Sequence, residues 1–387
     1  MNQYQQTLYN DLMALVKNSE AFYFADQILE GKTYRLFNYR LASYTDFLAP
    51  SALECRGHMF EVDPTVGDEN GYDMAIRLAA LPMSKFHNLN ECPFTQNLDL
   101  SQITEIQVKA DGSLMSTYIH STNGRVDVNS LRLKSKGSLS SDQAIAAMKW
   151  LDTQPFFKVE LAGLTVAGLT INLEWCSPEH RIVLGYMEPH LKILNARRRD
   201  NGEYLVHGHL CEMFGEDCVI KNINTDDPTA FVAAVPEMQD DIEGFVVTLE
   251  NGLRFKIKTA KYLSLHHAKD SINNPRRLFE AILDEGIDDL RSLFYTDPVA
   301  IMMIDEMQKK VDHLYNHMVK LVETFYEENK HLERKEYAIK GQSELERMFF
   351  GLAMNKYVGK DPEYKVWMKK HYKDFGIKDD AVLVEGG

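Results

Sequence analysis

The chain has few cysteines, and their spacing excludes the usual cysteine-based sites. The five cysteines are Cys55, Cys92, Cys176, Cys211 and Cys218. They form no CxxC pair and leave an odd number, which argues against a zinc knuckle and a disulfide scaffold and is typical of a reducing compartment. No apolar run approaches the roughly 20 residues that a membrane-spanning helix needs. The N-terminus, MNQYQQTLYNDLMALV, carries an early acid, unlike a signal peptide. We therefore expect a soluble, cytoplasmic protein with no membrane partner.

Positive charge is also scarce over the chain as a whole. The 43 lysines and arginines are outnumbered by 57 aspartates and glutamates, which gives a formal net charge of -14. Proteins that bind nucleic acids usually carry a basic field. An enzyme that holds a few phosphates in a cleft needs cations only in that cleft, so the acidic total does not exclude a polyphosphate or RNA substrate.

The length and the hydrophobic pattern predict two domains. A chain of 387 residues is too long for one ordinary compact domain. A first helix is predicted at residues 2–17, followed by strands in GKTYRLFNYR and ECRGHMFEV. Short strands broken by turn signals such as Asp111-Gly112 are predicted to fill residues 100–260. Long helical periodicity begins after Asn274-Pro275. We predict an α+β fold, with an antiparallel-sheet domain at residues 1–265 and an all-α domain at residues 266–387.

Strand alternation places several lysines and one glutamate on polar faces. These side chains are Arg254, Lys256 and Lys258 in LRFKIK, Glu174 in INLEWC, Arg132, Lys134 and Lys136 in RLKSKGS, and Lys109 in IQVK. Such residues usually lie on the solvated face of an antiparallel sheet. If the faces of several strands meet, the same residues would line a cleft suited to a polyphosphate and a divalent metal. The alternation leaves both interpretations open.

Lys109 stands immediately before a turn signal in the segment KADGSLMSTYIH. A nucleophilic lysine must be neutral, and neighbouring cations disfavour its charged form. If Lys256 and Lys258 lie beside Lys109, this lysine is suited to covalent catalysis.

Four motifs stand in the order found in covalent nucleotidyltransferases: KADG at 109–112, LEW at 173–175, EGF at 243–245 and FKIK at 255–258. The chain therefore resembles nucleic-acid ligases and capping enzymes. The surrounding segments narrow the resemblance to the single-strand RNA ligases of T-even bacteriophages, a family of tRNA-repair enzymes. These segments are SALECRGHMFE, KFHNLNE, KADGSLMSTYIH, LKSKGS, HRIVLGY, IEGFV and FKIK with YLSLH. The resemblance covers residues 30 to 270 and continues more loosely through the helical tail.

The resemblance implies a three-step reaction with ATP and Mg²⁺, or Mn²⁺ in its place. Lys109 would attack the α-phosphate of ATP, AMP would pass to an RNA 5'-phosphate, and an RNA 3'-hydroxyl would expel AMP and seal the strands. The implied catalytic residues are Lys109, Asp111, Gly112, Lys136, Lys256 and Lys258. The implied cofactor-binding residues are Tyr39, Arg56, Lys85, Phe86, Glu174, Arg197, Glu243, Lys256 and Lys258, with Glu174 and Glu243 also as metal ligands. Residues 1–100 would contribute to the triphosphate site.

The helical tail is expected to recognise the RNA. In NKYVGKDPEYKVWMKKHYK basic and aromatic residues alternate. If YKVWMKKHYK is helical, Lys365, Lys369 and Lys373 fall on one stripe that could follow a phosphate backbone. A solvated helix face explains the same pattern. Elsewhere, His207 and His209 form HGH, which we expect on a turn or strand surface rather than at a metal.

Other functions share parts of this pattern. The alternatives are a polynucleotide ligase acting mainly on other single strands, a DNA ligase, a GTP-using capping enzyme and a non-catalytic RNA-binding protein. DNA ligases and capping enzymes usually follow the last motif with a strand-rich OB domain, whereas this tail is predicted to be helical. The intact lysine, aspartate and glutamates argue against a non-catalytic protein. We expect a monomer whose partner is RNA with single-stranded ends, such as a cleaved tRNA anticodon loop.

Overall fold

The computed structural model of the chain divides into two compact units, Met1–His266 and His267–Gly387. It describes residues 1–122, 124–180, 186–240, 242–260, 262, 272 and 274–378. The predicted domain boundary at 265–266 and most of the segments HRIVLGY and YLSLH lie outside the described residues. No helix in the described ranges is both long enough and apolar enough to cross a membrane.

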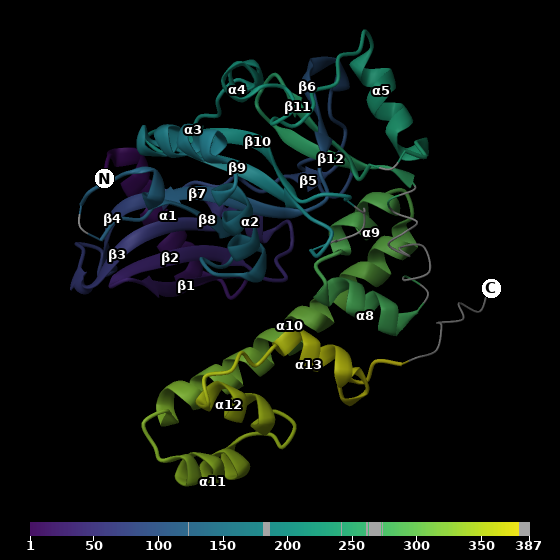
Figure 1. The fold of residues 1–387 in the computed structure, drawn as a ribbon. Helices are drawn as coiled ribbons and strands as arrows, with labels where there is room; N and C mark the ends of the chain where they lie inside the picture. Colours follow the sequence, from purple (N-terminus) through teal and green to yellow (C-terminus); the bar gives the residue numbers. More distant parts are fainter. Residues whose placement is uncertain are drawn as a thin grey trace, which may run out of the picture. The chain divides into compact units, whose positions relative to one another are not determined.

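Three four-stranded sheets form the framework of the first unit (Figure 1). The N-terminal sheet contains, in spatial order, β1 (Phe22–Leu29), β2 (Lys32–Tyr39), β3 (His58–Gly67) and β4 (Asp73–Ala80). The central sheet contains β10 (His190–Arg198), β9 (Leu169–Cys176), β7 (Ser113–Ile119) and β8 (Leu131–Ser135). The third sheet contains β5 (His87–Asn88), β12 (Arg254–Lys258), β11 (Gly244–Leu249) and β6 (Ile103–Lys109). All neighbouring strands are antiparallel except β5 and β12. The predicted antiparallel α+β architecture is confirmed.

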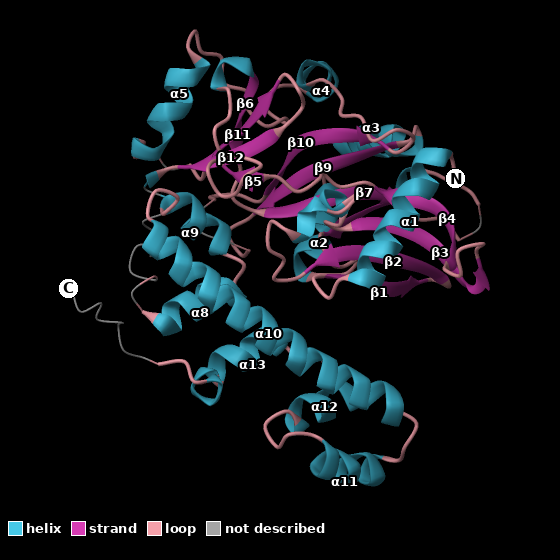
Figure 2. Ribbon diagram, turned by 180° about the vertical axis from the view of Figure 1, so that it is seen from behind, coloured by secondary structure: helices cyan, strands magenta, loops and turns pink. Residues whose placement is uncertain are grey.

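Each sheet buries an apolar face against helices (Figure 2). Helix α1 (Gln3–Asn18) begins with a capping box between Asn2 and Gln5, and its apolar face packs on the N-terminal sheet. The helices α2 (Asp142–Asp152), α3 (Pro155–Val166) and α4 (His207–Phe214) contribute to the core of the central sheet. Helix α5 (Pro228–Ala234) packs on the third sheet. Burying each large apolar side chain in these cores contributes about 1.5–3 kcal/mol.

The Asp111-Gly112 turn signal does not close a hairpin. Strand β6 ends at Lys109 and pairs with β11 in the third sheet, whereas β7 begins at Ser113 and pairs with β8 and β9 in the central sheet. Residues 110–112 therefore carry the chain from one sheet to the other. As a result, Lys109 lies at the junction of the two sheets.

The described elements of the second unit are helices, as predicted. They are α8 (Pro275–Leu283), α9 (Ile287–Leu293), α10 (Pro298–Asn329), α11 (Arg334–Glu344), α12 (Phe350–Tyr357), α13 (Tyr364–Lys370) and a 3-10 turn at Tyr372–Phe375. The side chain of Asn274 caps α8 by accepting from the Arg277 N–H, and Pro275 occupies the first helical position. The cap supplies an acceptor for the Arg277 N–H, which has no partner within the helix, and Pro275 has no N–H that needs one. Both features favour the start of a helix at this point.

Candidate active site

Glu243 lies between two lysines from neighbouring strands of the third sheet. Gly244, the first residue of β11, is opposite Lys109 of β6 on one side and Lys258 of β12 on the other. The Lys109 Nζ donates to Glu243 Oε2 at 2.6 Å, and the Lys258 Nζ lies 3.1 Å from Oε1. Lys109 and Lys258, one of the FKIK lysines, therefore contact the same buried carboxylate.

The neighbouring lysines stabilise the ionised form of Glu243. Burial raises the pKa of this carboxyl, but the positive charges of Lys109, Lys258 and Lys256 outweigh burial and leave the pKa below its ordinary value. Glu243 is therefore ionised at neutral pH, and its side chain fixes the position of the Lys109 ammonium.

Gly112 and Glu174 join the two sheets close to Lys109. The Gly112 N–H donates to Glu174 Oε1 at 3.1 Å. A β-carbon on Gly112 would collide with the backbone carbonyl oxygen of Trp175 and lie 3.0 Å from the Glu174 Cγ. The motif glycine is thus explained by the close approach of the segment after Lys109 to β9.

Asp111 is buried and forms hydrogen bonds with two tyrosines that are distant in the sequence. Its Oδ1 accepts from the Tyr262 hydroxyl at 3.0 Å, and its backbone N–H donates to the Tyr186 hydroxyl at 3.1 Å. Both tyrosines lie in segments that carry the resemblance, HRIVLGY and YLSLH, but neither was given a role, because Asp111 and Tyr262 are 151 positions apart and no local pattern couples them.

Glu174 is also a buried carboxyl, but its pKa is shifted in the direction opposite to that of Glu243. Burial, the largest influence, raises the pKa of Glu174 to about 7; the negative charge of Glu243 adds to this effect, while Lys109 and Arg56 oppose it. The carboxyl is therefore partly protonated near neutral pH in the free protein. A bound cation would favour its ionised form.

Removing this titratable group is expected to stabilise the free protein above pH 5. The pKa of Glu174 is raised from 4.5 to about 7 in the folded chain, so the unfolded chain loses this proton first as the pH rises. The stability of the native protein relative to Glu174→Gln should fall between about pH 4.5 and 7 and then stay constant, by a total of about 3 kcal/mol. Thermal unfolding of both proteins without nucleotide or metal measures this difference. The exposed Glu160→Gln is the control, and a pH-independent difference for Glu174→Gln would contradict the expectation.

A second group of predicted residues surrounds the ring of Tyr39. The Lys136 Nζ lies 4.3 Å and the Lys85 Nζ 5.3 Å from the ring centroid, distances typical of cation–π contacts. Phe86 is half-buried and immediately precedes β5, whose Asn88 pairs with Lys256. We call Tyr39, Lys85 and Lys136 the Tyr39 cluster.

Arg56 connects the Tyr39 cluster with Glu174. It lies in a turn before β3, so the predicted strand ECRGHMFEV begins only at His58. Its positive charge lowers the pKa of Glu174, and its Nη1 is buried with no hydrogen-bond partner among the described residues. The next residue, Gly57, has a φ of 86°, and a β-carbon there would lie 2.7 Å from the Lys136 carbonyl oxygen. A buried, unfilled guanidinium donor is suited to phosphate.

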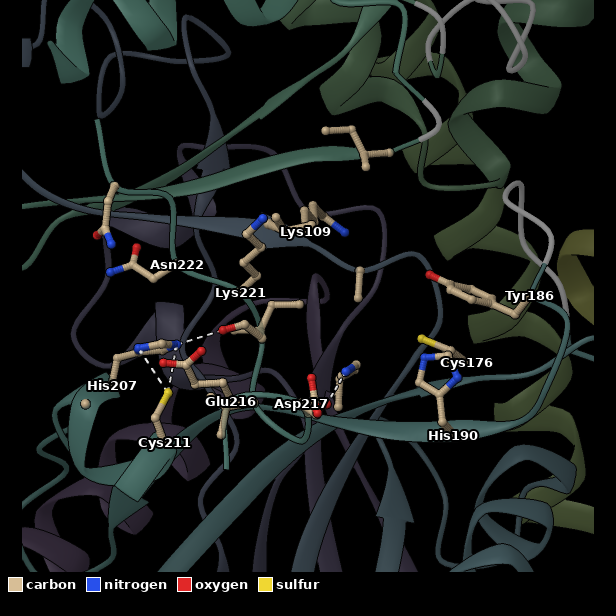
Figure 3. A pocket seen from close by; sticks show the side chains of 18 residues that line it. Lys109, Cys176, Tyr186, His190, His207, Cys211, Glu216, Asp217, Lys221 and Asn222 are labelled. Atoms are coloured by element: carbon tan, nitrogen blue, oxygen red, sulfur yellow. Dashed lines mark hydrogen bonds between the residues drawn. The ribbon is translucent and has the colours of Figure 1, made fainter. Parts of the chain in front are cut away.

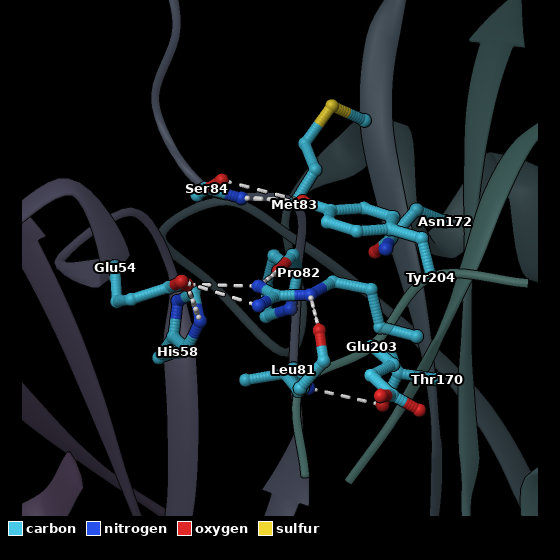
Figure 4. A network of polar contacts seen from close by, with 12 residues as sticks. Glu54, His58, Leu81, Pro82, Met83, Ser84, Thr170, Asn172, Glu203 and Tyr204 are labelled. Carbon is cyan, nitrogen blue, oxygen red and sulfur yellow. Dashed lines mark hydrogen bonds and ion pairs between the residues drawn. The ribbon is translucent and has the colours of Figure 1, made fainter. Parts of the chain in front are cut away.

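Arg197 is held in a separate polar network that includes Glu54 and Pro82, both labelled in Figure 4. Its Nη1 and Nη2 donate to Glu54 at 2.8 and 3.1 Å, its Nη1 also donates to the Pro82 carbonyl, and its Nε donates to the Gly202 carbonyl. The prediction that Arg197 binds the nucleotide stays a prediction; in this structure the Arg197 donors bind protein groups and its side chain is buried.

Glu54 anchors the turn that carries Arg56. Its carboxylate also lies 2.8 Å from the His58 Nε2. Burial raises the pKa of Glu54, but the bonds and charges of His58 and Arg197 outweigh burial and lower it to about 2. The turn at residues 54–57 is therefore fixed on both sides of Arg56.

A cavity of about 910 Å³ opens beside Lys109 (Figure 3). Residues 108–110 line it together with Cys176 of β9, Lys192 of β10, and His207 with Cys211 of α4. Its volume is within the usual range for small-molecule sites. Lys192, which pairs in register with Glu174, was not singled out in the sequence because a single strand lysine usually faces solvent.

His207 and His209 begin helix α4, so the prediction of a turn or strand surface is wrong. The His207 Nε2 contacts the Ile220 carbonyl at 2.7 Å, and its Nδ1 lies 3.6 Å from the Cys211 Sγ. No group of three or more histidines, cysteines, aspartates or glutamates in the described ranges is arranged to hold a metal. Two carboxylates, Glu174 and Glu243, remain the candidate metal ligands.

The tail lysines Lys365 and Lys369 form ion pairs within the second unit. The Lys365 Nζ donates to Glu285 at 2.6 Å, and Lys369 pairs with Asp284. Lys373 lies in the 3-10 turn after α13, so the predicted helical stripe ends before its third member. Both ion pairs are surface contacts, and such pairs exchange readily with other anions.

Two family models match consecutive parts of the chain. Residues 54–262 match a family described as RNA ligase, and residues 269–376 match a family described as T4 RNA ligase 1, C-terminal domain. The first match alone spans more than half of the chain.

Three solved structures show distant likeness. An archaeal ATP-dependent RNA ligase is 11% identical with a TM-score of 0.44, over 83% of this chain and 80% of the other. A putative ATP-dependent DNA ligase from Aquifex aeolicus is 12% identical with a TM-score of 0.42, over 91% and 99%. A mutant Naegleria gruberi RNA ligase with ATP and Mn is 14% identical with a TM-score of 0.36, over 67% and 83%.

Proposed function

Because the chain belongs to the T4-type RNA ligase family of covalent nucleotidyltransferases, we propose that it uses ATP to join RNA 5'-phosphate and 3'-hydroxyl ends. The observation that carries this proposal is the position of Lys109 at the junction of two sheets. There the Lys109 ammonium group donates to Glu243, Gly112 follows three positions later in the chain, and Lys109 lines a cavity. A lysine that served only solubility would have no need of a buried carboxylate or a neighbouring pocket.

In the first step, Lys109 Nζ forms a bond to the α-phosphorus of ATP, and the bond to the β-phosphate oxygen breaks to release pyrophosphate. Lys109 must lose a proton and leave Glu243 before it attacks. Lys258 shares the carboxylate of Glu243, so it is placed to neutralise the phosphate when Lys109 departs. Lys256 is opposite Val246 on the same pair of strands and adds to the positive field.

Glu174 and Glu243 fit a divalent cation. Both carboxyls are buried, and burial together with the negative charge of Glu243 raises the pKa of Glu174, so a cation placed here would favour its ionised form. Mg²⁺ or Mn²⁺ held here would neutralise phosphate charge during nucleotide transfer. Arg56 and the Tyr39 cluster would hold the rest of the triphosphate through Arg56 Nη1 and the ammonium groups of Lys85 and Lys136.

In the later steps AMP passes from Lys109 to an RNA 5'-phosphate, and the RNA 3'-hydroxyl then attacks that phosphate and expels AMP. We propose a cleaved tRNA anticodon loop as the substrate and the helical second unit as the part that recognises it. The all-helical second unit favours this substrate over the alternatives with an OB domain.

Joining assays on three substrates test the proposal. A nicked tRNA anticodon stem-loop should be sealed best, a linear single-stranded RNA less well, and a nicked duplex least. GTP should not replace ATP. Sealing of only the nicked duplex, or use of GTP in preference to ATP, would contradict the proposed function.

Substitution of the three tail lysines is expected to separate RNA recognition from adenylation. Lys365, Lys369 and Lys373 changed together to alanine should slow sealing of the anticodon stem-loop roughly tenfold and leave self-adenylation within about twofold. The broken surface ion pairs contribute about 0–1 kcal/mol each, so the fold should persist. The control changes three exposed lysines of the same unit, Lys309, Lys320 and Lys335. Equal losses in sealing and adenylation would show that the tail lysines do not bind RNA.

A further inference from the structure

Lys134 is a fully buried lysine with unused hydrogen-bonding capacity. Its side chain has no exposed surface, although the sequence pattern is that of a solvated strand face. Within the described part of the chain, its Nζ has one acceptor, the Ser135 carbonyl at 3.0 Å. An ammonium group has three donors. Burial and the positive charge of Arg56 lower the pKa of Lys134 to about 7, so the group is largely neutral at pH 8.

Strand register places Lys134 on the active-site face of the central sheet. Lys134 of β8 is opposite Ser116 of β7, which is opposite Asn172 of β9. The Ser116 hydroxyl donates to Asn172 Oδ1 at 2.7 Å. Asn172 and Glu174 are two residues apart on β9 and so share a face. The intervening Leu173 lies in the apolar core on the other side, as does Leu133 of β8.

Arg56 is close enough to both Lys134 and Glu174 to influence their charge. Its charge lowers the pKa of both groups, and its buried Nη1 has no partner among the residues described. A β-carbon on the next residue, Gly57, would lie 3.4 Å from the Lys134 Nζ, so the turn that carries Arg56 rests against this ammonium group. Two basic side chains, Lys134 and Arg56, therefore lie close together inside the protein, and both have donors without an acceptor among the described residues.

The other charged groups around Lys134 do not compensate this charge. Lys136 follows in the adjoining turn and is also cationic. His58 of β3 is fully buried, and burial lowers its pKa. Glu54 is engaged by His58 and Arg197, and no carboxylate in the described ranges forms an ion pair with Lys134. A buried cation without an anion is costly, which favours the neutral amine of Lys134 in the free protein, and a phosphate group would accept from the unfilled donors of Arg56 and Lys134.

We propose that Lys134 and Arg56 together bind a phosphate group of the nucleotide, and that Lys134 takes up one proton from solvent as this phosphate enters. This inference rests on the proposed function and adds a binding residue and a linked protonation to it. The neutral amine avoids an uncompensated charge in the free protein, and the phosphate supplies the counter-charge in the complex.

Calorimetric titration with ATP and Mg²⁺ at pH 8, in two buffers with different ionisation enthalpies, measures both affinity and protons exchanged. The Lys109→Ala background prevents nucleotide transfer during the titration. In this background, binding should take up close to one proton. Adding Lys134→Met should remove that uptake and weaken binding about 10- to 100-fold, the usual effect of losing one hydrogen bond from a charged group. Adding the exposed Lys149→Met should change neither quantity.

Thermal unfolding establishes that the Lys134→Met protein is folded. Methionine fits an apolar site of similar length, and loss of the buried amine should raise Tm increasingly as the pH falls from 10 to 7. Unchanged affinity in Lys134→Met, or reduced affinity with the same proton uptake, would overturn the inference and leave the proposed function intact. Failure of the folded wild-type chain to bind ATP at all would instead refute the proposed function, and the inference with it.

Discussion

The Lys109→Ala variant is expected to form no covalent adduct with AMP, a loss on the order of 10⁴-fold or more. Lys109 supplies the nitrogen that bonds to phosphorus, and the Glu243 carboxylate that holds it cannot take over this role. The variant should still seal an RNA that already carries AMP on its 5'-phosphate, because that step begins after the lysine has acted. Labelled ATP followed by denaturing electrophoresis measures the first effect, and sealing of pre-adenylated RNA measures the second.

The exposed Lys149 on α2 provides the matched control. Lys149→Ala should retain both activities. If Lys109→Ala were labelled as strongly as the wild-type chain, Lys109 would not be the nucleophile. If it lost both activities and its fold together, the change would be structural, which the melting temperature reports separately.

The Gly112→Ala variant is expected to lose adenylation by about two orders of magnitude or more while its helical second unit stays intact. A β-carbon at this position collides with the Trp175 backbone carbonyl, and backbone cannot move aside as a flexible side chain can. Relief of the collision must separate residues 110–112 from β9 and break the hydrogen bond from Gly112 to Glu174. Displacements of about 1 Å at a reacting group cost on the order of 10²-fold in rate.

Gly163→Ala is the control for Gly112→Ala. Gly163 is in helix α3, where a β-carbon meets nothing within 4 Å, so alanine should leave activity unchanged and raise stability slightly. Adenylation by Gly112→Ala at the wild-type rate would contradict the close packing between β9 and the segment that follows Lys109.

Local patterns in the sequence were sufficient to predict much of the fold. The alternation in LRFKIK correctly placed Phe255 and Ile257 in the core and Lys256 and Lys258 on the other face, because this strand has one apolar side. The helical pattern after Asn274-Pro275 was recognised from its periodicity, and the structure begins α8 at Pro275 with Asn274 as the cap.

The parts that could not be predicted depend on pairing between distant segments. Lys109 and Glu243 are 134 positions apart, and only the shared register of β6 and β12 with β11 brings the two lysines onto one carboxylate. The burial of Lys134 could not be predicted, because alternation placed it on a polar face of β8 without showing whether that face is covered. Arg197 was assigned to the nucleotide by the resemblance alone, and its contact with Glu54 could not be predicted because the two residues are 143 positions apart.

The site of nucleotide attachment tests the central claim most directly. The wild-type chain should be incubated with ATP and Mg²⁺, digested, and analysed by mass spectrometry under conditions that preserve a phosphoramide bond. We predict AMP on the side chain of Lys109 and on no other lysine, including Lys134 and Lys136. AMP attached to a different residue, or no AMP on a folded chain that binds ATP, would contradict the account.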